Sequence, residues 1–290
     1  MYKRFLLLVL SAILLFLFSS CNTPDVNEVA SSSEEENWVS SEPECIENKI
    51  EQKGPTVLPM LSNEDYFASG TYCDPITHEK VYYLFHEPAR ENDEKRPLII
   101  FLHGRGDTVN MYSLGTSTPF VNSLMQLENQ SEKYGAYTLV PSTPLAEELD
   151  WSFSQLETFK KLIFYIKENY NVDEKRIYVT GISMGGFTTC KLVDQMPDDF
   201  FAAAVPLSGA KSMLYPEITH NTAFRIYHSA NDMVVNVSCS RNLYEQLVQS
   251  GHPKVEYIEF EDGDHISPLY SVYVEGRDSF FEWLFAQKLP

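Results

Sequence analysis

The sequence is poor in cysteine, in positive charge and in long apolar runs. Its five cysteines include no pair with metal-ligand spacing, so we expect no zinc site and no other metal. Lysine and arginine total 22 against 41 acidic residues, and the resulting net charge of −19 argues against nucleic acid as a partner. The main apolar run, residues 5–18, is too short to span a bilayer comfortably. No internal repeat and no apolar lid-like insertion is visible.

The amino end has the features of an export signal. Lys3 and Arg4 precede the apolar run, which ends in Phe18-Ser-Ser-Cys21. Residues 1–20 are therefore predicted to be a signal peptide. Small residues before a cysteine resemble the lipobox of bacterial lipoproteins, although leucine is commoner where Phe18 stands, and this resemblance implies that Cys21 is lipidated. An ordinary secreted protein with an incidental cysteine is the alternative.

Residues 21–54 are predicted to be an acidic, disordered tether. The segment is rich in Ser, Glu, Asn and Pro and has too few apolar residues to form a core. The expected location is the cell envelope, with the chain anchored through its lipid to the outer membrane or cell surface. Four further cysteines, Cys45, Cys73, Cys190 and Cys239, allow three pairings, but Cys190 is expected to be a buried free thiol.

Residues 55–290 are predicted to form one α/β domain. Two β-prone segments, 66–72 and 81–85, flank a turn and indicate an antiparallel edge hairpin. From residue 97 onward, short apolar strands alternate with helical stripes: strands are expected at 97–102, 137–140, 202–206, 224–228 and 255–260, and helices at 120–134, 155–170, 238–250 and 276–288. This alternation predicts a mostly parallel sheet with helices on both faces.

The chain is organised around residues 176–197. Strand-forming residues lead into Gly181-Ile-Ser183-Met-Gly185, and apolar residues at helical spacing follow. Gly-x-Ser-x-Gly between a strand and a helix is the signature of a nucleophile elbow, in which the serine is strained and its neighbours must be small. Ser183 is therefore the candidate nucleophile.

The elbow sequence IYVTGISMGGF, followed by FFAAAVPLSGA, resembles the α/β-hydrolase superfamily. The match is to the carboxylesterase, dienelactone hydrolase and predicted peptidase branch, to which feruloyl and acetyl-xylan esterases are similar. It covers about residues 80–288 and implies the α/β-hydrolase fold. It also implies catalysis by a serine, an acid and a histidine in that chain order, without a cofactor.

His265 and Asp232 best complete this triad. His265 follows the last predicted strand, whereas His252 precedes it. His228 lies within a strand and is expected to be a buried structural residue. Asp232 follows the strand 224–228 and begins a segment similar to the Asp-x-x-Val of the family. The rival acids Asp262 and Asp264 lie so close to His265 that they are expected to shape its turn.

Three more residues are candidates at the site. Met184, directly after the nucleophile, and the backbone of Arg105 in His103-Gly-Arg105-Gly-Asp are expected to form the oxyanion hole. The resemblance implies that His103 shapes this loop rather than transferring protons. It also places Trp151 on a loop near the substrate, where the side chain would either stack on a sugar or aromatic acyl group or simply pack.

The sequence thus predicts an exported serine esterase that hydrolyses short-chain or aromatic acyl esters, including carbohydrate esters. A peptidase of the prolyl-oligopeptidase type is the first alternative, but those enzymes carry a large extra domain. A binding protein on an inactive hydrolase scaffold is the second, although Ser183, Asp232 and His265 are all present.

Overall fold

A computed structural model describes residues 67–89, 93–105, 118–142 and 153–290. They form one eight-stranded sheet with the order β1-β2-β4-β3-β5-β6-β7-β8. The strands are β1 (Ala68–Cys73), β2 (Lys80–His86), β3 (Arg96–Leu102), β4 (Tyr137–Ser142), β5 (Val172–Ile182), β6 (Ala203–Leu207), β7 (Ala223–Ser229) and β8 (Val255–Phe260). The strands from β4 to β8 in this order are all parallel.

The predicted edge hairpin is present. β1 pairs with β2 and β2 pairs with β4, both antiparallel. β4 runs past Val140, where the sequence pattern stopped, because Pro141 and Ser142 continue the pairing with Tyr83 and Tyr82 of β2. The sheet is therefore mixed at one edge and parallel in the part that carries the candidate site.

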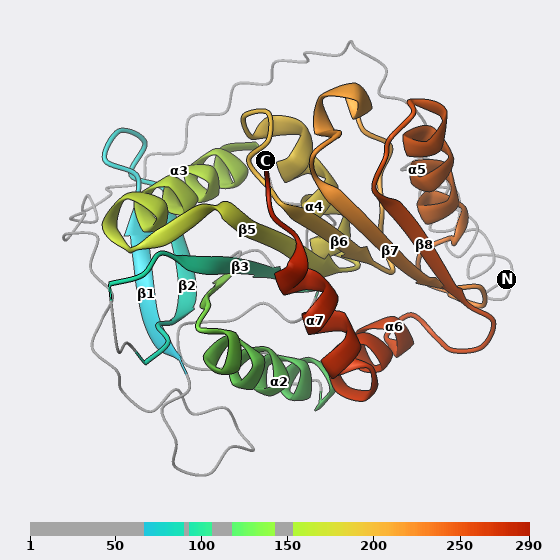
Figure 1. The fold of residues 1–290 in the computed structure, drawn as a ribbon, viewed down its shortest axis with the longest axis horizontal. Helices are drawn as coiled ribbons and strands as arrows, with labels where there is room; N and C mark the ends of the chain where they lie inside the picture. Colours follow the sequence, from blue (N-terminus) through green and yellow to red (C-terminus); the bar gives the residue numbers. More distant parts are fainter. Residues whose placement is uncertain (1–66, 90–92, 106–117, 143–152) are drawn as a thin grey trace, which may run out of the picture. The chain divides into compact units, whose positions relative to one another are not determined.

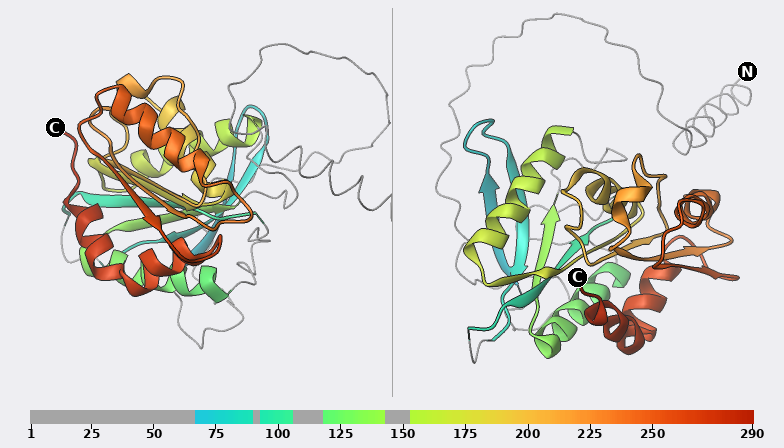
Figure 2. Two further views of the ribbon diagram at one scale, coloured as in Figure 1. Left: turned by 90° about the vertical axis from the view of Figure 1, so that its right-hand side faces the viewer. Right: turned by 45° about the horizontal axis from the view of Figure 1, so that its top comes forward.

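Helices cover both faces of the sheet (Figures 1 and 2). One face carries α3 (Phe153–Asn169), α4 (Met184–Gln195) and α5 (Ser238–Gln249), and the other carries α2 (Thr118–Tyr134), α6 (Ser267–Tyr270) and α7 (Arg277–Ala286). Short helical turns also occur at Pro216–Thr219 and, as a π-helix, at Ser271–Glu275. The fold expected from the alternation of elements, that of the α/β-hydrolases, is confirmed.

The central strands are apolar throughout because they are buried on both sides. In β3, Leu98, Ile100 and Leu102 pack into the core under α3 and α4, while Ile99 and Phe101 pack into the core under α2 and α7. Each of these side chains is fully buried. A continuous apolar run is what a strand between two helical layers requires, and it places the carboxyl ends of the parallel strands at one edge.

The segment that links β8 to α7 was missed by the sequence analysis. It folds into α6 and the π-helix, and the fully buried Tyr273 lies within it. The Tyr273 hydroxyl is 2.7 Å from Oγ1 of Thr180 in β5, three residues before Ser183. This hydrogen bond fastens the segment after His265 to the strand that carries the nucleophile.

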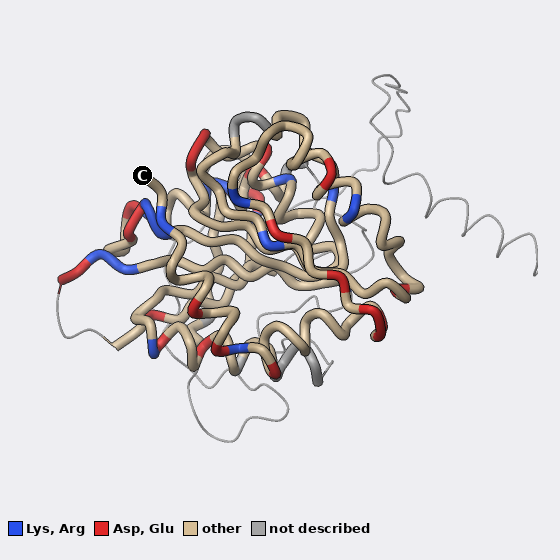
Figure 3. Tube along the Cα trace, turned by 45° about the vertical axis from the view of Figure 1, so that its right-hand side comes forward, with Lys and Arg blue, Asp and Glu red and all other residues tan. Residues whose placement is uncertain are grey.

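Charged residues lie on helices, on loops and also within strands such as β8 (Figure 3). Within the described residues, no helix is long and apolar enough to cross a membrane, and no cluster of three His, Cys, Asp or Glu side chains could hold a metal ion. The predicted signal peptide, Cys21, the tether and Cys45 lie outside the described residues. Cys73 and Cys239 each take part in a disulfide bond. Cys190 is a buried free thiol, as expected, and burial raises its pKa to about 12.

Candidate active site

Ser183 lies between the end of β5 and the start of α4 in a strained conformation. Its φ is 56° and its ψ is −117°, a region that residues other than glycine rarely occupy. The backbone N–H of Ser183 is held by the carbonyl of Leu207 at the end of β6, at 2.9 Å. The side chain makes no capping hydrogen bond to α4, and it is partly exposed. The hydroxyl is therefore presented at the surface at the carboxyl edge of the sheet.

Glycines allow the elbow to pack directly against neighbouring backbone. A Cβ on Gly185 would lie 2.1 Å from the carbonyl oxygen of Leu102, where β3 ends. A Cβ on Gly209, after β6, would lie 2.3 Å from the carbonyl oxygen of Ser183. The nucleophile is thus wedged between the loops that follow β3 and β6, and no side chain fits at either contact.

Replacing Gly185 by alanine should therefore disturb both folding and turnover. The methyl group would meet backbone atoms of Leu102 and His103, which cannot turn away as a side chain can. We therefore expect a loss of about 1–3 kcal/mol in the free energy of unfolding, typical of overpacking. A shift of about 1 Å at Ser183 would cost roughly 100-fold in kcat/KM. Denaturant unfolding and hydrolysis of a short nitrophenyl ester measure the two effects.

Gly251→Ala is the matched control for this variant. Gly251 has a positive φ, 77°, unlike Gly185, and a Cβ there would meet nothing within 4 Å. It should lose some stability through backbone strain and keep its turnover. A folded Gly185→Ala protein with unchanged turnover would show that the close contact with Leu102 does not position the nucleophile.

The structure brings Asp232 and His265 together although 33 positions separate them. Asp232 follows β7 and His265 follows β8, and these strands are paired in parallel. The distance from His265 Nδ1 to Asp232 Oδ2 is 2.7 Å. The other carboxylate oxygen, Oδ1, accepts the backbone N–H groups of Val234 at 2.8 Å and Val235 at 2.9 Å. His265 Nδ1 donates to a carboxylate that cannot rotate, which leaves Nε2 as the free ring nitrogen.

The side chain of Asp232 is fully buried yet remains ionised. Burial by itself would raise the pKa of this carboxyl, but hydrogen bonds from His228 and His265 and from the Val235 N–H outweigh it and hold the pKa well below its usual range. The side chain of His265 is 12% exposed. A buried anion beside a partly exposed imidazole is the arrangement that orients a general base and stabilises its protonated form.

The rival acid Asp264 has another role in the described structure. Its Oδ1 accepts the N–H groups of Ile266 and Ser267, both at 3.0 Å, and the Ser267 hydroxyl at 2.8 Å. These bonds close a tight turn around His265, and none of them reaches the imidazole. Asp262 is exposed in the same acidic turn. The geometry therefore favours Asp232 over both as the partner of His265.

Ser183 and His265 lie at the same edge of the sheet, after β5 and β8 respectively. Within the described residues, their side chains share no hydrogen bond. Hydrogen bonds between nucleophile and base are often long in a free enzyme and tighten when substrate binds.

Of the two expected oxyanion donors, Met184 directly follows Ser183. α4 begins at Met184, and the first N–H groups of a helix have no partner within it, so the Met184 N–H is available. Arg105 lies just beyond the end of β3, with an exposed side chain. Its contribution to the oxyanion hole stays a prediction. Trp151 lies outside the described residues.

His103 is fully buried, and its Nδ1 donates to the carbonyl of Gly104 at 2.8 Å. Burial lowers the pKa of the imidazole. A neutral, buried ring bonded to its own loop fits the structural role that the resemblance implied. The backbone carbonyl of His103 also lies against Gly185.

The sequence analysis missed the part that His228 plays. It predicted a buried structural histidine, and His228 is fully buried, but its Nε2 lies 3.1 Å from Asp232 Oδ2. The available signal was position: a residue near the end of a strand, four before the acid, lies beneath the loop that the acid begins.

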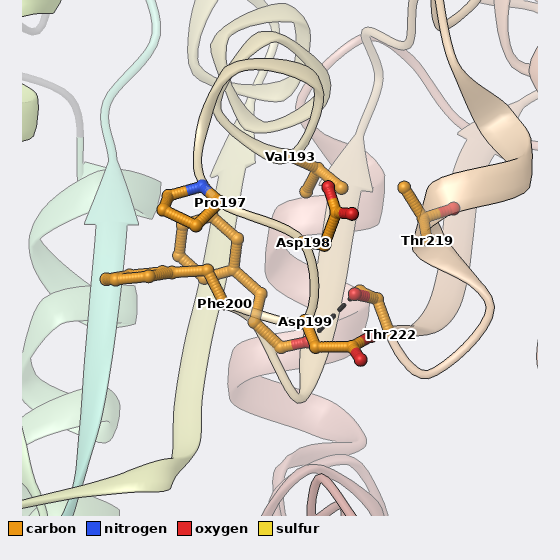
Figure 4. Close-up of a pocket in the computed structure, with 8 residues that line it drawn as sticks. Val193, Pro197, Asp198, Asp199, Phe200, Thr219 and Thr222 are labelled. Atoms are coloured by element: carbon orange, nitrogen blue, oxygen red, sulfur yellow. Dashed lines mark hydrogen bonds between the residues drawn. The ribbon is translucent and has the colours of Figure 1, made fainter.

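A small hollow of about 10 Å³ lies far from this site, before the amino ends of β6 and β7 (Figure 4). It is lined by Val193, Pro197, Asp198, Asp199, Phe200, Phe201, Thr219 and Thr222. That volume holds about one water molecule. It does not fit a substrate.

Comparison with known proteins identifies relatives of this chain. The model of the prolyl oligopeptidase family (Peptidase_S9) matches residues 146–224, the stretch that includes Ser183. Poly(3-hydroxyalkanoate) depolymerase C of Paucimonas lemoignei is 27% identical over 119 residues, which cover 39% of this chain and 28% of the relative. Feruloyl esterase B of Neurospora crassa is 26% identical over 160 residues, which cover 51% of this chain and 48% of the relative.

Among solved structures, a thermostable esterase superposes with a TM-score of 0.65 and 29% identity. The match covers 77% of this chain and 64% of the esterase. The chain spans about half or less of the length of the two curated relatives described above.

Proposed function

Because this chain is a member of the α/β-hydrolase superfamily and related to its esterases, we propose that it is a serine hydrolase of carboxylic esters. The observation that carries the proposal is the Asp232–His265 pair, 2.7 Å apart, at the same sheet edge as a strained, partly exposed Ser183. A serine hydroxyl needs a base to take its proton and an acid to hold that base in the right tautomer. All three groups are present in the chain order of this superfamily.

In the proposed reaction, His265 Nε2 takes the proton of the Ser183 hydroxyl while Oγ attacks the ester carbonyl. The negative charge that develops on the carbonyl oxygen is bound by the N–H of Met184 and by a second donor from the loop after β3, for which we propose the backbone of Arg105. His265 then gives its proton to the departing alcohol, which leaves an acyl group on Ser183. Water, activated by the same imidazole, releases the acid.

A serine peptidase is the second candidate, and the match of residues 146–224 to the prolyl oligopeptidase family favours it. One observation favours ester cleavage. Two of the curated relatives are esterases by name, the feruloyl esterase described above and a bifunctional acetylxylan esterase/xylanase of Neocallimastix patriciarum. Chromogenic dipeptides assayed beside nitrophenyl esters distinguish the two, because a peptidase would cleave both and an esterase only the second.

We propose short or aromatic acyl groups, including acetyl and feruloyl groups on carbohydrates, as the substrate class. A feruloyl esterase and an acetylxylan esterase among the relatives support this, as does the absence from the sequence of an apolar lid-like insertion. Acetyl and feruloyl esters should be cleaved far faster than palmitoyl esters. Faster cleavage of the long-chain ester would refute the assignment.

Trp151 is proposed to stack on the aromatic or sugar part of such substrates. Stacking contributes about 1 kcal/mol beyond burial, so Trp151→Ala should lower kcat/KM about fivefold on feruloyl or sugar esters and leave nitrophenyl acetate almost unchanged. Equal losses on both kinds of substrate would mean that Trp151 only packs.

The proposed location is the cell envelope, with the chain held by a lipid on Cys21. Expressed in a bacterium with its own leader, the protein should incorporate labelled fatty acid and partition into detergent. Cys21→Ser should abolish both while leaving esterase activity intact, because Cys21 lies far in sequence from the triad. A wild-type protein that takes up no label would overturn this proposal.

A further inference from the structure

His228 lies directly beneath the loop that follows β7 and contains Asp232 (the acid loop), and it is fully buried. It is the last residue but one of β7, so its backbone is fixed in the sheet by pairing with β8. Its ring reaches two elements. Nδ1 lies 2.7 Å from Oγ of Ser240 in the first turn of α5, and Nε2 lies 3.1 Å from both Asp232 Oδ2 and the carbonyl oxygen of Val235.

These contacts determine which ring nitrogen carries the proton. A carboxylate oxygen and a carbonyl oxygen can only accept hydrogen bonds, so Nε2 must be the donor toward Asp232 and Val235. Ser240 Oγ is fully buried and can donate its hydroxyl proton to an unprotonated Nδ1. The neutral Nε2–H tautomer therefore satisfies every contact of the ring.

As a result, the carboxylate of Asp232 accepts hydrogen bonds from four donors. Oδ1 receives the N–H groups of Val234 and Val235, and Oδ2 receives His265 Nδ1 and His228 Nε2. A carboxylate has about four positions at which to accept hydrogen bonds. All four are filled, and the fully buried His228 supplies the second donor to Oδ2.

Among the acids that the structure describes, Asp232 alone accepts a hydrogen bond from His228. The one acidic residue paired with it across the sheet is Glu259 of β8. Both oxygens of that carboxylate are occupied by Arg241, at 2.8 and 2.6 Å, and the Tyr257 hydroxyl adds a bond of 2.6 Å. Arg241 and Tyr257 hold the pKa of Glu259 at about 2.

We propose that His228 is a positioning residue for catalysis: its Nε2–H fixes the rotamer of Asp232 so that Oδ2 faces His265, and Ser240 keeps His228 in the required tautomer. The proposal rests on the function proposed above. It predicts that the Nε2–H donor matters, because a shape-filling side chain without a donor would leave Asp232 with one fewer bond to the interior.

Three variants test this, each assayed on a short nitrophenyl ester. His228→Leu removes the donor and should lower kcat by roughly 10- to 100-fold, the size of loss found when a group that orients a metal ligand is removed, with KM within about twofold. His228→Gln places an amide N–H near the position of Nε2 and should restore kcat to within about fivefold of wild type. The kcat of Ser240→Ala should lie between those of His228→Leu and His228→Gln.

His252→Gln is the matched control. His252 is also buried, and its Nε2 donates to a backbone carbonyl, that of Thr219, at 2.8 Å. It lies before the amino end of β8, away from the triad, so its variant should lose stability without losing kcat. If His228→Leu does not fold, the comparison of His228→Gln with Ser240→Ala still tests the proposal. A kcat of Ser240→Ala below that of His228→Gln would support the positioning role, and the reverse order would contradict it.

A spectroscopic measurement separates this proposal from the proposed function. The Nδ1 proton of His265, bonded to Asp232, should give a far-downfield proton resonance, and it should move in His228→Gln and not in His252→Gln. Wild-type protein that has this resonance but cleaves no ester would refute the proposed function and leave the positioning role standing. A folded His228→Leu protein with wild-type kcat and an unmoved resonance would overturn the positioning role.

Discussion

Replacement of Ser183 by alanine is expected to lower kcat by about 10⁵- to 10⁶-fold, to the residual rate that binding and oxyanion donors give without a nucleophile. The expectation follows from the geometry: Ser183 has the conformation of an elbow, its hydroxyl caps no helix and its side chain is partly exposed. His265→Ala should cost a similar amount. The double variant should be little worse than either single one, because nucleophile and base act as a unit.

The fold should survive the loss of the Ser183 hydroxyl, since that hydroxyl makes no hydrogen bond in the described residues. Circular dichroism and thermal unfolding check this, and Ser279→Ala, the same change at an exposed position in α7, is the matched control with unchanged kcat. Residual activity in Ser183→Ala within about tenfold of wild type would mean that another group performs the attack.

Asp232→Asn is expected to lower kcat by about 10⁴-fold with the fold intact. An asparagine of the same shape can still accept the N–H groups of Val234 and Val235 through its carbonyl oxygen. The amide group then faces His265 Nδ1, and because an amide N–H₂ only donates, the imidazole is driven into the wrong tautomer. Single-turnover kinetics on a nitrophenyl ester measure the loss at the acylation step.

Asp264→Asn serves as the comparison, because Asp264 bonds only to its own turn in the described structure. It should lower kcat by far less. If Asp264→Asn abolished turnover while Asp232→Asn left it nearly unchanged, the acid would have been misassigned despite the 2.7 Å contact.

The sequence predicts those parts of the molecule that are determined by short, local sequence patterns. Apolar runs such as 97–102 and 202–206 mark strands buried on both faces, and the elbow needs glycines at fixed positions around Ser183. The chain order of nucleophile, acid and base is a property of the superfamily, so Asp232 and His265 could be selected before their contact was seen.

The parts that the sequence did not reveal depend on contacts between distant residues. Nothing local marks Tyr273 as the partner of Thr180, since the two lie 93 positions apart and meet only when the sheet is formed. The extension of β4 through Pro141 depends on pairing with β2. His228 reads as an ordinary buried strand residue until α5 brings Ser240 to one ring nitrogen and the acid loop brings Asp232 to the other.

The most direct test of the central claim is to label the nucleophile. The protein is incubated with a fluorophosphonate, which reacts with an activated serine, and the site of attachment is located by mass spectrometry of peptides. Wild-type protein should take up one label per chain, on Ser183, and both Ser183→Ala and His265→Ala should take up none. Label on any other residue, or labelling of Ser183 that persists in His265→Ala, would contradict the account.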